Sequence, residues 1–155
     1  MRALFLTLLI AASASAARPA EVATNDLKIL HPWTRPAAQG GNAAGYLTIA
    51  NAGPADVLLA VETPVARASL HRSSMQAGMS TMRDMASGLA APARQTVVLA
   101  PGGDHIMLAG LTRPLLAGQK IPATLVFQRA GRVKIEISVE ASTPSAANSA
   151  TLNRH

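Results

Sequence analysis

The stretch Arg132–Glu140, RVKIEISVE, decides the fold class. Valine or isoleucine occupies every second position, and charged or polar residues occupy the positions between them. Successive side chains of a β-strand point to opposite faces, so this alternation predicts a strand with one face in the core and the other in solvent. Valine and isoleucine also favour strands, because their branched side chains pack well on a pleated surface.

Upstream of this stretch, short apolar runs alternate with turn signals such as Gly40–Asn42, Asn51–Pro54 and Ala100–Asp104. Proline and glycine interrupt every longer periodic run, so no helix is predicted. We expect an all-β domain, a Greek-key β-barrel or sandwich. Its predicted strands are Leu27–Leu30, Ala44–Asn51, Val57–Glu62, Ala66–Arg72, Thr81–Met85, Thr96–Leu99, His105–Ala109, Ala123–Gln128 and Arg132–Glu140.

The N-terminus has the pattern of a secretory signal peptide, which we place at residues 1–16. Its apolar run, residues 3–12, is about half the length that a membrane span needs. Residues 17–26 would then be a leader and residues 27–140 the β domain. Residues 141–155, which are small and polar, would be a disordered tail. We therefore expect an exported protein with no membrane span in its mature chain.

The overall composition excludes several classes of function. The chain carries 14 Lys and Arg against 8 Asp and Glu, a net charge of +6, and these charges are scattered. No basic cluster is interleaved with aromatic residues, so no nucleic-acid partner is expected. The absence of cysteine excludes disulfides and a blue-copper centre, which needs a thiolate ligand. No convincing catalytic triad, carboxylate pair or phosphate loop is present, and we expect no enzyme.

The methionines point to a different chemistry. Apart from the initiator, all of them lie within 33 residues, and two of the four histidines lie in or beside that window. Thioether and imidazole ligands without a thiolate suit a soft monovalent ion such as copper(I). The alternative is that these methionines only fill the core, and the spacing of the first four would also fit one face of a helix. The methionines are Met75, Met79, Met82, Met85 and Met107.

Strand periodicity separates some of these residues. In DHIMLAG, Ile106 and Leu108 are natural core residues, so His105 and Met107 should share the opposite face. If Leu70 is buried, the same argument points His71 away from the core, and Met82 can likewise project outward. The two methionines that differ from Met82 in parity, Met79 and Met85, are expected to pack, and Met75 is left undecided.

The arrangement resembles the periplasmic copper chaperones of the PCu(A)C family. Their pattern is a histidine, a methionine eleven residues later, and an H-x-M pair about twenty-two residues after that. His71, Met82 and the pair His105 and Met107 match it, with one extra residue between Met82 and His105. The resemblance covers roughly residues 28–140. Further similar stretches are Pro32–Pro36, Gly45–Asn51, Pro101–Gly103 and Leu108–Leu111.

The resemblance implies a cupredoxin-like barrel that binds one copper(I) per chain near its surface. The implied metal ligands are His71, Met82, His105 and Met107. It also implies a periplasmic chaperone that delivers copper towards the dinuclear copper centre of cytochrome c oxidase, with an oxidase subunit or a thioredoxin-like assembly factor as acceptor. The chain departs from the family at Arg72, where many members carry an acidic residue.

Two other functions stay open. A periplasmic copper buffering or resistance protein would use the same ligands without a dedicated acceptor. A metal-free β-sandwich interaction module would use the methionines only as core residues.

Overall fold

The computed structural model describes residues 21–24 and 26–141. The predicted signal peptide at 1–16 lies outside the described residues, as do residues 17–20 of the predicted leader and 142–155 of the predicted tail. Within the described ranges the chain is all strand and turn, which confirms the all-β class. That part of the chain also contains no helix with the length and hydropathy of a membrane span.

The strands are β1 (Glu21–Thr24), β2 (Leu27–Thr34), β3 (Ala43–Asn51), β4 (Asp56–Glu62), β5 (Arg67–Gln76), β6 (Met79–Asp84), β7 (Leu89–Ala91), β8 (Thr96–Leu99), β9 (Asp104–Ala109), β10 (Lys120–Phe127) and β11 (Gly131–Val139).

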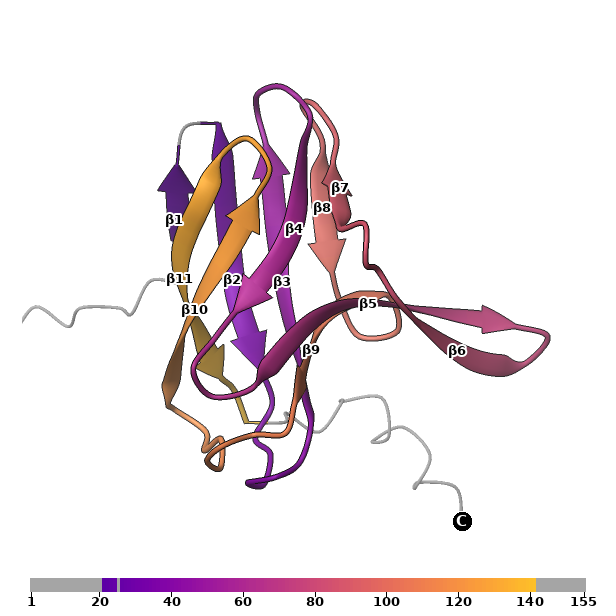
Figure 1. The fold of residues 1–155 in the computed structure, drawn as a ribbon, viewed down its shortest axis with the longest axis vertical. Coiled ribbons are helices and arrows are strands. Elements are labelled where there is room, and N and C mark those ends of the chain that lie inside the picture. The colour runs from indigo at the N-terminus through magenta and orange to yellow at the C-terminus, as the bar shows by residue number, and fades with distance from the viewer. Residues whose placement is uncertain (1–20, 25, 142–155) are drawn as a thin grey trace, which may run out of the picture.

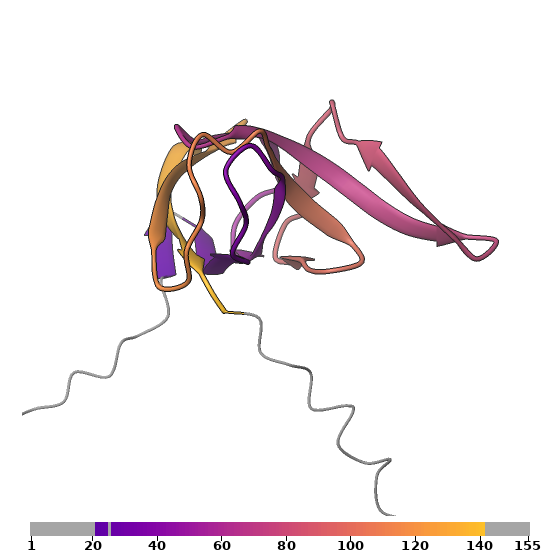
Figure 2. The ribbon, with the colours of Figure 1, turned by 90° about the horizontal axis from the view of Figure 1, so that it is seen from below.

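All of these strands belong to one sheet, in the order β6-β5-β9-β3-β2-β11-β10-β4-β7, with β1 paired to β2 and β8 to β3. Every pair is antiparallel except β2 with β11. The sheet is open, because the path ends at β6 and β7. It folds over on itself to enclose the core, and the β5–β6 hairpin extends away from the enclosed part (Figures 1 and 2).

The core confirms the alternation read from the sequence. In β11, Val133, Ile135, Ile137 and Val139 are buried, while the charged residues between them are exposed. Ile106 and Leu108 of β9 and Leu70 of β5 are buried as expected. Within the described residues, the buried apolar side chains form one continuous cluster, to which both halves of the folded sheet contribute.

Two strands were not predicted. β1 lies within the segment that we expected to be a leader. Of its four residues only Val22 packs against the core, so the strand gives little periodic signal in the sequence. β7 has three residues, of which Leu89 and Ala91 are buried against β4. A segment of this length is too short to show a period in sequence.

β2 is longer than predicted because it continues through Pro32. The pairing of β2 with β3 shifts register between Leu30 and Trp33, and His31 has a φ of 46°. This β-bulge leaves Pro32 without a ladder hydrogen bond to donate, which is the condition under which a strand accommodates proline.

The β5–β6 hairpin is also longer than predicted. Ala77 and Gly78 form a two-residue turn in which both φ angles are positive, 50° and 79°, as in type I′ hairpin turns. Because the hairpin extends beyond the part of the sheet that encloses the core, the expectation that Met79 packs was wrong: this residue is 69% exposed. Met85, just after the hairpin, packs against the core as expected.

Candidate metal centre

Three neighbouring strands carry the four predicted ligands. His71 lies on β5, Met82 on β6, and His105 and Met107 on β9. Residues directly opposite each other in a sheet point to the same face, and His71 pairs with His105. Met107 pairs with a residue two before His71, and Met82 with a residue two after it. All four side chains therefore lie on one outer face, as strand parity predicted.

Three of these side chains line one hollow of about 300 Å³. Of these three, Met82 is 54% exposed, whereas His105 is only 5% exposed. The imidazole ring of His71 adjoins that of His105, with ring centroids 5.8 Å apart and ring planes inclined at 59°. The hollow is lined by Asn42, Ala43, Ala44, Tyr46, Ser73, Met82, Gly102, His105 and Met107.

The hydrogen bonds of the two imidazoles leave one nitrogen of each ring for another partner. Nδ1 of His105 lies 3.0 Å from the carbonyl oxygen of Gly103, which accepts only if Nδ1 carries the proton. The lone pair is then on Nε2. In His71, the hydroxyl oxygen of Ser69 lies 3.0 Å from Nε2, which leaves the lone pair on Nδ1 when Nε2 donates.

Nδ1 of His71 is the one buried side-chain nitrogen or oxygen in the described part of the chain that has no hydrogen-bond partner. An unsatisfied buried polar atom costs about 1–3 kcal/mol. A metal bond at Nδ1 would remove that cost, so the donor set and this orphaned atom both fit a soft ion bound between β5, β6 and β9.

An ion pair joins β5 to β9 beside the two histidines. Arg72 pairs with Asp104 across the strands, and its Nε and Nη2 lie 2.7 and 2.9 Å from the two carboxylate oxygens. The hydrogen bonds that Arg72 donates to the Asp104 carboxylate, together with the negative charge of that group, raise the pKa of Arg72. The positive charge of Arg72, the point at which the chain departs from the family resemblance, is thus matched by the negative charge of Asp104.

Sequence reasoning missed these supporting groups. Asp104 precedes the H-x-M pair directly, but nothing local shows that it meets Arg72, 32 residues away. The carbonyl of Gly103 accepts a hydrogen bond from the backbone N–H of Ser73 as well as from His105, and so links both strands. A histidine ligand usually donates its second N–H to such a group, which is the signal that could have directed attention to Gly103.

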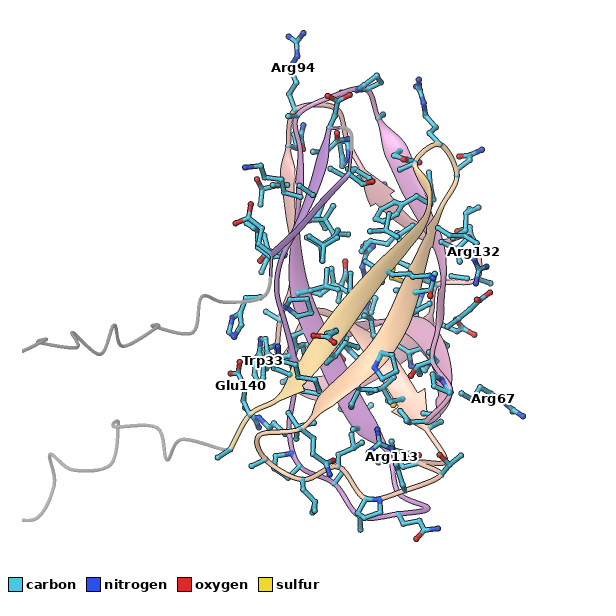
Figure 3. All side chains as sticks on the ribbon, turned by 90° about the vertical axis from the view of Figure 1, so that its left-hand side faces the viewer. Trp33, Arg67, Arg94, Arg113, Arg132 and Glu140 are labelled. Carbon is cyan, nitrogen blue, oxygen red and sulfur yellow. The ribbon has the colours of Figure 1, made fainter. Side chains whose placement is uncertain are left out.

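Aromatic side chains extend from the hollow along the same face. Tyr46 lines the hollow, and Trp33 packs on Tyr46 with ring centroids 4.8 Å apart. His31 stacks on Trp33, and its Nε2 lies 2.6 Å from a carboxylate oxygen of Glu140. Figure 3 shows Trp33 and Glu140 side by side. Because β3 lies between β9 and β2, Tyr46 separates Trp33 from the candidate ligands.

Other parts of the surface offer less metal chemistry. Among residues 21–24 and 26–141, no three His, Cys, Asp or Glu side chains gather in a way that could hold a metal ion. A larger groove of about 890 Å³ lies over β1, β4, β10 and β11 and contains none of the four candidates. Arg67, Arg94, Arg113 and Arg132 point outward at separate places (Figure 3), in agreement with the scattered charge of the sequence.

Comparison with known proteins adds a sequence family. The family model described as "Putative lipoprotein LpqE-like" matches residues 27–139. The protein named "Putative lipoprotein Lxx21020" from Leifsonia xyli subsp. xyli is 37% identical over 128 residues, which cover 82% of this chain and 76% of that protein.

Solved structures of PCuAC domains share the fold. The apo PCuAC domain from PmoF1 matches with a TM-score of 0.66 and 32% identity, covering 78% of this chain and 98% of that domain. The copper-bound PCuAC domain from PmoF2 matches with a TM-score of 0.66 and 31% identity, covering 78% and 97%. The solution structure of CuI-DR1885 from Deinococcus radiodurans matches with a TM-score of 0.53 and 30% identity, covering 70% and 76%. These matches confirm the cupredoxin-like fold.

Proposed function

Because the chain belongs to the LpqE-like family and folds as PCuAC domains do, we propose that it is a copper(I) chaperone and not an enzyme. Copper(I) is its cargo, one ion per chain. One observation carries the proposal: three adjacent strands bring His71, Met82, His105 and Met107 to one outer face beside a hollow. Solved relatives that carry copper, the PmoF2 domain and CuI-DR1885, support the choice of metal.

The proposed ligands suit copper(I) on chemical grounds. Two thioethers and two neutral imidazoles form a soft, uncharged set. A thioether carries no proton, so binding at Met82 and Met107 does not compete with protonation, unlike binding at a thiol. The set also avoids cysteine, which would oxidise to a disulfide in an exported protein.

Transfer would proceed by ligand exchange. Both His105 and Met82 line the hollow, but His105 is buried whereas Met82 is more than half exposed. A ligand of the acceptor therefore approaches the ion from the side of Met82 and forms its bond while bonds to this chain break one at a time. The copper stays in the same oxidation state throughout, and no proton is required from the thioethers.

The acceptor that we propose is a protein on the route to the dinuclear copper centre of cytochrome c oxidase, reached in the periplasm. The lipoprotein names of the matched family and relative support export. Deletion of the gene should lower oxidase activity when copper is scarce. Normal oxidase activity together with copper sensitivity would instead indicate a buffering protein.

The metal site is tested by anaerobic titration with copper(I) against a competing chelator. His71→Ala, Met82→Leu, His105→Ala and Met107→Leu should each weaken binding about tenfold or more, which corresponds to about 1.4 kcal/mol. Met79→Leu is the matched control, because Met79 lies on the same hairpin but pairs on its opposite face. Unchanged affinity in all four variants would refute the ligand assignment.

A further inference from the structure

The β5–β6 hairpin exposes more thioether than packing explains. Met75, Met79 and Met82 are 71%, 69% and 54% exposed, and the hairpin extends away from the part of the sheet that encloses the core (Figures 1 and 2). Methionine ordinarily fills gaps in a core, and a single exposed apolar side chain is common on a surface. Three exposed methionines on one hairpin next to a soft metal site have no such explanation.

The register of the hairpin divides these three residues. Met75 pairs with Ser80, and Ser73 pairs with Met82. Since paired residues share a face and residues two apart along a strand do so too, Met75 lies on the same face as Met82. Met79 pairs with Gln76 and lies on the opposite face.

Met75 and Met82 are also diagonal neighbours across the two strands. Such neighbours have Cα atoms about 7–8 Å apart and Cβ atoms somewhat closer, within reach of long side chains. Ser73 and Ser80, which complete this patch of four, are small and leave the space between the two thioethers open. Flexible methionine side chains can therefore bring both sulfur atoms to one ion.

We propose that Met75 is a transfer ligand, a side chain that binds copper(I) only while the ion enters or leaves the site. This inference rests on the proposed function. During release, a bond from Met75 Sδ to copper forms as the bond from Met107 Sδ breaks, and Met82 stays bound. One thioether replaces another, no electron or proton is exchanged, and the ion moves from the hollow onto the hairpin.

The hairpin is built to present this ligand. The two-residue turn at Ala77 and Gly78 closes the strands tightly, and the hydroxyl oxygens of Ser74 and Thr81 lie 3.0 Å apart on the face opposite Met75. The β5–β6 hairpin is thus a regular strand pair that holds Met75 outside the set of residues lining the hollow. Because Met75 is exposed and His105 is buried, a protein acceptor meets Met75 before it can reach His105.

The test compares Met75→Leu with Met79→Leu in the full chain. Each variant is loaded with one equivalent of copper(I) without oxygen, and transfer to bicinchoninate is followed by stopped-flow absorbance. Met75→Leu should slow transfer about tenfold, whereas Met79→Leu should leave the rate unchanged. The equilibrium Kd of Met75→Leu should change by less than about twofold, because Met75 is not a resident ligand.

The transfer rates and the equilibrium Kd values together test the role of Met75 separately from the proposed function. Equal transfer rates in the two variants would overturn the role of Met75. A Kd of Met75→Leu that rises as much as the rate falls would also overturn it, since Met75 would then be a resident ligand or a structural residue. The proposed function fails separately, if none of the four ligand variants, His71→Ala, Met82→Leu, His105→Ala and Met107→Leu, weakens equilibrium binding.

Discussion

Asp56, at the start of β4, joins this strand to the turn between β10 and β11. One carboxylate oxygen accepts hydrogen bonds from the backbone N–H groups of Val57 and Arg129, both at 2.8 Å, and the other accepts one from Ala130 at 2.9 Å. Burial raises the pKa of Asp56, but the three N–H groups and the charge of Arg129 together lower it below its ordinary value. Asp56→Ala removes both acceptor oxygens and, with them, all three hydrogen bonds.

The expected loss follows from these contacts. A buried hydrogen bond to a charged group contributes about 1.5–3 kcal/mol. Because these three are only partly buried, we expect Asp56→Ala to lower the free energy of unfolding by about 3 kcal/mol in total. For a domain of this size that corresponds to a fall in Tm of about 10 °C. Asp56→Asn keeps the oxygen that accepts two of the bonds, and should cost about half as much.

The pH dependence of thermal stability can refute this account of Asp56. A carboxyl group whose pKa is lowered by folding stabilises the fold above its unfolded value of about 3.9, and that contribution is lost as pH falls through the folded value. We therefore expect the difference in Tm between wild type and Asp56→Asn to become smaller below about pH 4. Thermal unfolding followed by circular dichroism measures this difference. A Tm difference between wild type and Asp56→Asn that stays the same from neutral to acid pH would contradict the reasoning, as would an unchanged Tm in Asp56→Ala.

Two further changes separate stability from copper binding. Gly88 has a φ of 87°, and a Cβ there would lie 2.5 Å from the carbonyl oxygen of Leu58. Gly88→Ala should therefore lower the free energy of unfolding by about 2 kcal/mol or more, measured by thermal unfolding. The same change should leave the copper(I) Kd unchanged. Asp104→Asn breaks the ion pair with Arg72, and because the Arg72 side chain is more than half exposed, the change should cost less than about 1 kcal/mol of stability. The same change should weaken copper(I) binding about threefold or more in chelator competition, because the pair joins β5 to β9 beside the imidazoles; an unchanged Kd would show that it does not position them.

The sequence was sufficient where a residue's role depends on its own strand. The alternation in Arg132–Glu140 predicted both faces of β11, and the apolar partners Ile106 and Leu108 placed His105 and Met107 on the outer face. These inferences need only the two-residue period of a strand. The positions of all nine predicted strands follow from the same signal and the turns between them.

Where the sheet ends could not be predicted in this way. Parity correctly placed Met79 on the face opposite Met82. It could not show that the hairpin has left the enclosed part of the sheet at Met79, where both of its faces meet solvent. The burial of His105 and the contact between Arg72 and Asp104 depend on the pairing of β5 with β9. That pairing joins segments about thirty residues apart, and no local pattern specifies it.

The central claim is that copper(I) is held by the four side chains on β5, β6 and β9. X-ray absorption at the copper edge of the protein loaded with one equivalent of copper(I) tests this most directly. The account predicts one copper environment with both thioether sulfur and imidazole nitrogen neighbours, and loss of the sulfur shell when Met82 and Met107 are both changed to leucine. A copper environment of nitrogen and oxygen alone, or a sulfur shell that survives the double change, would contradict it.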